Sequence, residues 1–133
     1  AWDIGIDRWF FGVGPGNFQE KYLEYQVYYP PYPEWAVPQP HNIFLAFWLQ
    51  TGFIGFLGFI VLFFSSIYRA GKNILYFQKK EKKFFLMIVL FGFSFLLLTF
   101  VWGMVDTLFW KNDLSLLFWF VVFSITTSTK VKM

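Results

Sequence analysis

The sequence predicts an all-α polytopic membrane protein, with three transmembrane helices preceded by an outer-face loop domain that contains short helices. The chain is 57% hydrophobic and 26% aromatic, and only 14% of its residues are charged. A soluble domain of this length could not bury so much apolar surface, whereas a lipid bilayer accepts it. The apolar residues also gather in three long runs separated by charged segments. Since the chain has no cysteine, disulfides and thiolate metal sites are excluded.

Residues 1–42 are predicted to be an extracytoplasmic segment, the C-terminal part of a larger loop. Aromatic and charged residues alternate over residues 1–11, which is typical of a segment at the level of the lipid headgroups. The run Gly12-Val-Gly-Pro-Gly-Asn17 contains three glycines and a proline, so it interrupts any helix. Asn17 is then a candidate N-cap for a short helix that ends near Gln26.

A proline-rich stretch follows, with five prolines between Val27 and Pro40. Because proline fixes φ and favours an extended residue before it, the stretch is predicted to be an irregular or polyproline segment. It also carries four aromatic residues: Tyr28, Tyr29, Tyr32 and Trp35. Their rings suit two roles, resting on the membrane interface or stacking against sugar rings.

The transmembrane region is predicted over residues 43–133, with spans near 43–68, 84–105 and 114–129. At the rise of an α-helix these runs cover about 39, 33 and 24 Å, compared with a hydrocarbon core of roughly 30 Å. The first span is therefore expected to tilt, and the third to rely on snorkelling by Lys130 and Lys132. In the first span Gly52, Gly55 and Gly58 recur at a spacing that would let another helix approach closely.

The distribution of charge predicts the orientation. A basic cytoplasmic loop is expected over residues 69–83, which hold six basic residues and one acid. Residues 1–42 hold only Arg8 and Lys21 against five acidic residues. The positive-inside rule therefore predicts that residues 1–42 lie outside and that the C-terminus is cytoplasmic.

The only histidine, His41, lies where the proline-rich segment meets the first span. The free N–H groups and the dipole of a helix N-terminus disfavour another positive charge, so the imidazole is expected to stay neutral at neutral pH. A neutral imidazole is able to accept the proton of a hydroxyl as a general base. The alternative is a histidine that only caps the helix or anchors the loop.

Two further groups of residues are candidates for a site. Gly14, Gly16 and Asn17 precede a predicted helix, where backbone N–H groups can form a nest for a phosphate; the alternative is a turn that joins two helices. Asp106 ends the second span and is a candidate substrate-binding acid at the membrane edge. Asp113 begins the third span and fits an N-cap. One histidine and scattered acids make no metal site, and no cofactor is expected.

Several short motifs follow one another along the chain: Phe11-Gly-Val-Gly-Pro-Gly-Asn-Phe18, Tyr22, Tyr25, Pro40-His-Asn-Ile-Phe-Leu45, Trp48, Gly52-Phe-Ile-Gly55, Gly103-Met-Val-Asp106 and Lys111-Asn-Asp-Leu-Ser-Leu-Leu-Phe-Trp119. In this order they resemble the C-terminal portion of the membrane domain shared by the O-antigen ligase / O-antigen polymerase family. The His-Asn pair followed by Gly-x-x-Gly weighs most in the resemblance.

The resemblance implies a multi-pass glycosyltransferase of the bacterial inner membrane, which moves a glycan from undecaprenyl pyrophosphate to an acceptor hydroxyl. The implied partners are a lipid-linked oligosaccharide donor, a glycan or lipid acceptor, and membrane lipids, without nucleic acid. The family's essential histidine maps onto His41. The candidate substrate-binding residues are then Asn42, Gly14, Gly16, Asn17 and Asp106. Arg8 cannot be matched to the arginines that hold the pyrophosphate in the family. A ligase-like enzyme is expected, with a polymerase of the same family as the alternative.

Two other classes of function are weighed against this enzyme. One is a non-enzymatic transport or assembly module, which the scarcity of polar residues inside the spans disfavours, since they hold only Gln50 and scattered serines and threonines. The other is a small three-span protein complete in itself. The first residues read as the middle of an element, so the chain is expected to be a piece of a larger protein and to be inactive alone.

Overall fold

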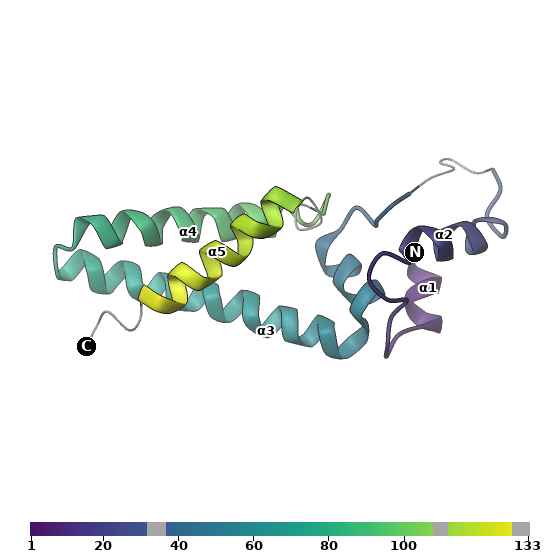
Figure 1. Ribbon diagram of the computed structural model, residues 1–133, viewed down its shortest axis with the longest axis horizontal. Helices are drawn as coiled ribbons and strands as arrows, with labels where there is room; N and C mark the ends of the chain where they lie inside the picture. Colours follow the sequence, from purple (N-terminus) through teal and green to yellow (C-terminus); the bar gives the residue numbers. More distant parts are fainter. Residues whose placement is uncertain (32–36, 108–111, 129–133) are drawn as a thin grey trace. The chain divides into compact units, whose positions relative to one another are not determined.

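The computed structural model describes residues 1–31, 37–107 and 112–128, without the side chains of 112 and 113, and all regular structure in these ranges is helical (Figure 1). The helices are α1 (Trp2–Asp7), α2 (Phe18–Gln26), α3 (Ile43–Lys79), α4 (Lys83–Trp102) and α5 (Asn112–Ser128). The predicted all-α class is confirmed over these residues. Predictions about the side chains of Tyr32, Trp35, Asp113, Lys130 and Lys132 fall outside them.

The chain divides into two compact units. The first consists of residues 1–59 and 103–107, and the second of residues 60–102 and 108–133. Two helices, α3 and α4, are long and apolar enough to cross a membrane, with mean hydropathies of 2.0 and 2.7 over their most apolar stretches. Less than a third of each stretch is buried, unlike the core helix of a soluble protein. The third apolar helix, Leu114–Ser128, is shorter, so two of the three predicted spans have spanning length.

The helix boundaries differ from the prediction at one place. Helix α3 continues without interruption past Tyr68 to Lys79, so the loop predicted over residues 69–83 is wrong for residues 69–79. The physical reason is a continuous buried face: Ser66, Ala70, Asn73 and Phe77 recur every three or four residues and are all buried. A basic segment with that periodicity stays helical, because its lysines lie on the opposite, exposed face.

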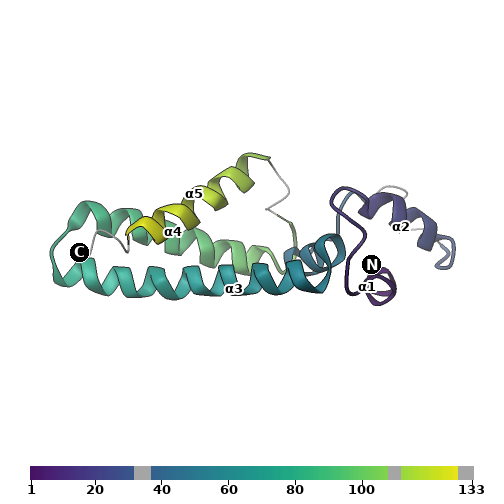
Figure 2. The same ribbon diagram turned by 60° about the horizontal axis from the view of Figure 1, so that its bottom comes forward.

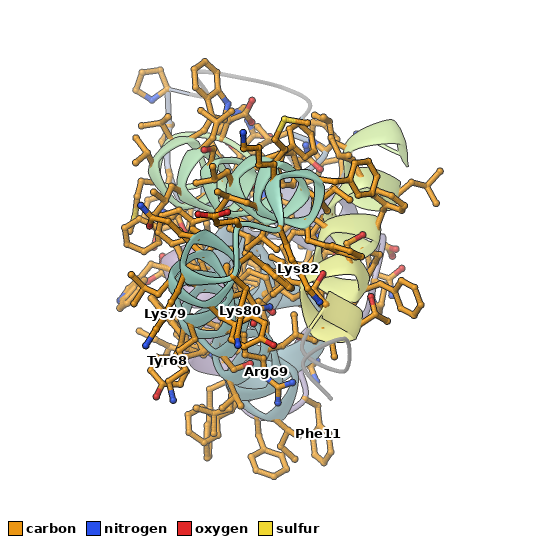
Figure 3. All side chains as sticks on the ribbon, turned by 90° about the vertical axis from the view of Figure 1, so that its left-hand side faces the viewer. Phe11, Tyr68, Arg69, Lys79, Lys80 and Lys82 are labelled. Carbon is orange, nitrogen blue, oxygen red and sulfur yellow. The ribbon has the colours of Figure 1, made fainter. Side chains whose placement is uncertain are left out.

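The turn between α3 and α4 is a Schellman motif. The N–H of Lys82 donates to the carbonyl of Phe77 at 3.1 Å, and the N–H of Glu81 donates to the carbonyl of Gln78 at 3.2 Å. Glu81 takes the left-handed position with φ of 53°, which usually belongs to glycine. Figure 3 looks onto this end of the hairpin and labels Lys79, Lys80 and Lys82 there, together with Arg69, which comes earlier on α3. The lysines of this turn are exposed.

The second unit has a core of aromatic and aliphatic side chains from α3, α4 and α5, and Figure 2 shows α4 and α5 beside the later turns of α3. The ring of Phe63 stacks on those of Phe100 and Phe118, with centroids 6.4 and 6.3 Å away. Gly92 lets α5 approach α4, since a Cβ there would lie 3.2 Å from the side chain of Val121. The second unit is therefore held by close helix packing.

The first unit has a small core in which Ile4, Phe18, Val37 and Leu49 are buried. Two hydrogen bonds also tie α1 to α2 and the residues after it. The hydroxyl of Tyr25 donates to the carboxylate of Asp7, and that of Tyr29 donates to Asp3 at 2.8 Å. Helix α2 begins directly after Asn17, as predicted, but the side-chain amide of Asn17 donates back to the Val13 carbonyl at 3.1 Å instead of capping the helix.

The two tyrosine–aspartate pairs give a testable pH dependence. Hydrogen bonds to Asp7 and Asp3 raise the pKa of Tyr25 and Tyr29, because the carboxylates favour the neutral phenols. Their contribution to stability is therefore complete below the unfolded pKa of about 10 and is lost as the pH rises through the higher folded values. We expect Tyr25→Phe to lower the unfolding temperature at neutral pH and to have no effect once both phenols are ionised. Equal loss at every pH in thermal melts would contradict this.

Candidate functional site

The only histidine of the chain faces an acid that is far from it in the sequence but belongs to the same compact unit. His41 directly precedes the start of α3, and Asp106 belongs to the segment Gly103–Thr107 that follows α4. The imidazole Nδ1 lies 3.5 Å from the carboxylate Oδ1, and the side chains are 65% and 30% exposed. The N–H of Thr107 donates to the same carboxylate oxygen at 2.7 Å, which fixes the orientation of Asp106.

Asn42 holds the two parts of this site together. Its side-chain oxygen accepts the N–H of Leu45 at 2.9 Å, which is the bond of an N-cap at the start of α3. Its side-chain nitrogen donates to the carbonyl of Met104 at 3.1 Å, and the next residue, Ile43, donates its N–H to the carbonyl of Gly103 at 2.7 Å. The capping role considered for His41 therefore belongs to Asn42, which also anchors the segment that carries Asp106.

The geometry gives the two imidazole nitrogens different roles. A carboxylate beside Nδ1 favours a proton on that nitrogen, which leaves the lone pair on Nε2 at the exposed edge of the ring. Chemically, the pair can accept a proton at Nε2 from a group that approaches from outside.

The glycine-rich run lies against α3 about two turns further on. Gly12, Gly14 and Gly16 all have positive φ, between 71° and 87°. The N–H of Val13 donates to the carbonyl of Leu49 at 2.7 Å, and the N–H of Gly16 donates to the side-chain oxygen of Gln50 at 3.1 Å. Because these amides are already bonded within the protein, the contacts favour the turn interpretation over the phosphate nest.

Gly52 is the point where this run and α3 meet most closely. Its φ of 69° and ψ of −171° are not helical, and the N–H of Phe53 donates to the carbonyls of Trp9 and Phe10 at 3.0 Å. A Cβ on Gly12 would lie 2.6 Å from the Gly52 nitrogen. The expectation that Gly52 lets another helix approach is therefore wrong: the close neighbour is the backbone of the preceding loop. Gly58 has no atom within 4 Å of its Cβ position.

The predicted site residues thus fall into two groups. His41, Asn42 and Asp106 come together at the start of α3. Gly14, Gly16 and Asn17 gather near Gln50, which is about 12 Å further along α3 at the rise of an α-helix. The role of Gln50 was not predicted. A buried amide inside an apolar run, here 5% exposed, was the signal that it has a polar partner.

An apolar pocket of about 550 Å³ opens next to Asn42 in the same unit. Nearly all of its lining comes from aromatic and aliphatic side chains of α3 and of the residues in and around α1: Trp2, Trp9, Phe44, Leu45, Trp48, Phe53 and Phe56. The Trp48 Nε1–H donates to the Trp9 carbonyl at 3.0 Å, so the polar group of that indole already has a partner within the protein. Such a lining suits a hydrocarbon chain and not a polar ligand.

Comparison with known protein families shows what the first part of the chain is similar to. A family model described as O-antigen ligase matches residues 1–60. This confirms the resemblance to the O-antigen ligase family over these residues. The match covers His41, Asn42 and the glycine-rich run, while Asp106 lies outside it. No curated protein and no solved structure gave a match to the chain.

The O-antigen ligase family and the helices together define the broad class of the protein. The family points to glycosyltransferase-like enzymes with lipid-linked glycan substrates, and α3 and α4 are long and apolar enough to cross a membrane. Over residues 1–60 the chain is therefore similar to the O-antigen ligase family, and its two long apolar helices are of membrane-spanning type. The matched residues nearly coincide with the continuous part of the first unit, which carries His41.

Proposed function

We propose that this chain carries the proton-accepting part of a membrane glycosyltransferase, which moves a glycan from undecaprenyl pyrophosphate to an acceptor hydroxyl. The observation that carries the proposal is the His41–Asp106 pair at the start of α3, within the unit that matches the O-antigen ligase family. The exposed imidazole is open to an acceptor from outside, and Asn42 keeps the acid beside it.

In the proposed reaction the acceptor hydroxyl attacks the anomeric carbon of the donor sugar. A carbon–oxygen bond forms there, and the bond from that carbon to the pyrophosphate oxygen breaks. The hydroxyl proton passes to Nε2 of His41, and its bonding electrons stay on the attacking oxygen. Undecaprenyl pyrophosphate leaves with the electrons of the broken bond. Asp106 stabilises the imidazolium that results.

The remaining residues take supporting roles in this proposal. The apolar pocket beside Asn42 is suited to the first isoprene units of the lipid carrier, because its lining offers almost no polar group. Gly14, Gly16 and Asn17 are assigned to packing, since the amides of this run are bonded to α3 and to the run itself. This departs from the phosphate-binding role expected from their position in the sequence. No residue in the described part is assigned to the pyrophosphate.

Replacing Asp106 by asparagine tests the pair in the full-length protein. We expect kcat for transfer from the lipid-linked donor to fall about tenfold or more, with KM little changed, because the amide keeps the shape but cannot stabilise the imidazolium. An unchanged kcat would remove Asp106 from the mechanism. Offering core glycan and growing repeat in separate assays distinguishes a ligase from a polymerase.

A further inference from the structure

A second pocket of about 320 Å³ lies between α1 and α2, apart from the residues assigned to catalysis. Seven residues of mixed character line it: Ala1, Trp2, Asp3, Tyr22, Tyr25, Gln26 and Tyr29. All belong to the first unit and come from α1 and the residue before it, from α2, and from the segment that follows α2. The pocket has about the volume of one or two sugar rings, and nothing in the proposed transfer step uses it.

The lining combines the two kinds of group that recognise a sugar. Trp2 and Tyr29 present exposed aromatic surface, 63% and 56% of each residue, against which the C–H face of a pyranose can lie. The Asp3 carboxylate accepts the Tyr29 hydroxyl at 2.8 Å and keeps further lone pairs for sugar hydroxyls. The amide of Gln26 is able to donate as well as accept. Hydroxyl-rich ligands need such carboxylate and amide partners.

The two pockets of this unit differ in the polarity of their linings, so they suit different kinds of ligand. The pocket beside Asn42 is lined almost entirely by apolar atoms, whereas polar atoms form a substantial part of the wall between α1 and α2. A lipid chain would displace water from the Asp3 carboxylate, whose lone pairs are not all used by the Tyr29 hydroxyl, and this desolvation costs free energy. The Asp3 carboxylate also disfavours the role of an interface anchor, which favours neutral aromatic and basic residues.

We propose that the pocket between α1 and α2 binds a sugar ring of a glycan substrate, and this rests on the proposed glycan transfer. The ring stacks on Tyr29 and Trp2, and its hydroxyls donate to Asp3. The glycan has two possible sources, the donor oligosaccharide and the acceptor, which share this chemistry. The sequence leaves two roles open for Tyr29, which are contact with the membrane interface and stacking against a sugar ring. The lining of the pocket favours stacking against a sugar ring.

Direct binding to the purified full-length protein tests the proposal. The probe is the free oligosaccharide released by mild acid from the lipid-linked donor, and saturation-transfer NMR or calorimetry measures its affinity. We expect Tyr29→Ala to weaken binding about tenfold, because the stacking surface is lost. Tyr29→Phe keeps the ring and should weaken it far less. The matched control is Tyr28→Ala, since Tyr28 is 77% exposed and does not line the pocket.

The same measurement with delipidated acceptor glycan shows whether the donor oligosaccharide or the acceptor glycan binds in the pocket. Tyr29-dependent binding of either glycan supports the proposal. Equal affinity of Tyr29→Ala and wild type for both glycans overturns it. His41→Ala separates this result from the proposed function, because it should stop transfer and leave oligosaccharide binding unchanged. If His41→Ala still transfers glycan, the mechanism fails, while Tyr29-dependent binding continues to support the pocket. Thermal melts of each variant confirm that it is folded.

Discussion

Replacement of His41 by alanine in the full-length protein is expected to reduce glycan transfer about 100- to 10,000-fold, the usual contribution of a general base. The loss should appear in kcat, because the imidazole takes up the proton only as the acceptor hydroxyl attacks. Transfer of labelled glycan from the lipid-linked donor to its acceptor, followed in proteoliposomes, measures it. A variant that keeps transfer within a few-fold of wild type would exclude His41 as the base.

The structure makes this variant informative, because the substitution should not disturb the fold. The side chain is 65% exposed, and the N-cap of α3 is supplied by Asn42. Expression and melting temperature are therefore expected to match wild type. Gln39→Ala changes a neighbouring residue of the same segment that has no role in the proposed step, so it is the matched control. Added imidazole should partly restore the activity of His41→Ala, since the site is open, whereas a purely structural histidine would not be rescued this way.

Replacement of Gly52 by alanine is expected to destabilise the first unit by about 3 kcal/mol or more. Two costs combine. The φ of 69° and ψ of −171° lie in a region that is essentially restricted to glycine. A Cβ would also collide with the carbonyl of Phe10, which is backbone and cannot move aside without displacing the loop. The hydrogen bonds from Phe53 to Trp9 and Phe10 would be lost with it.

Gly58→Ala is the matched control on the same helix. It has helical conformation and no atom within 4 Å of the Cβ position, so alanine should be neutral or should stabilise by about 0.5–1 kcal/mol. Thermal unfolding in detergent measures the difference between the two variants. Limited proteolysis on the C-terminal side of residues 1–11 measures it as well. If Gly52→Ala and Gly58→Ala unfolded at the same temperature, the contact between the loop and α3 would not be what stabilises the first unit.

Local pattern was sufficient for the helices whose boundaries depend on nearby residues. The apolar runs predict α3, α4 and α5, and Asn17 marks the start of α2 correctly. Residues 69–79 are the exception, because their charge favours a loop whereas the spacing of their apolar residues favours a helix. Ala70, Asn73 and Phe77 continue the buried face of α3, and their 3.6-residue spacing was readable in the sequence.

The sequence by itself determined that this chain is helical and apolar enough for a membrane, and that His41 lies at the start of an apolar helix. Only the tertiary structure decided which groups surround His41. Asp106 reaches it because Asn42 and Ile43 bind the backbone of Gly103–Thr107, a contact between segments far apart in the chain. The break at Gly52 likewise follows from the backbone of Phe10. Periodicity and capping rules act within a few residues, so pairings of this kind are set by long-range packing.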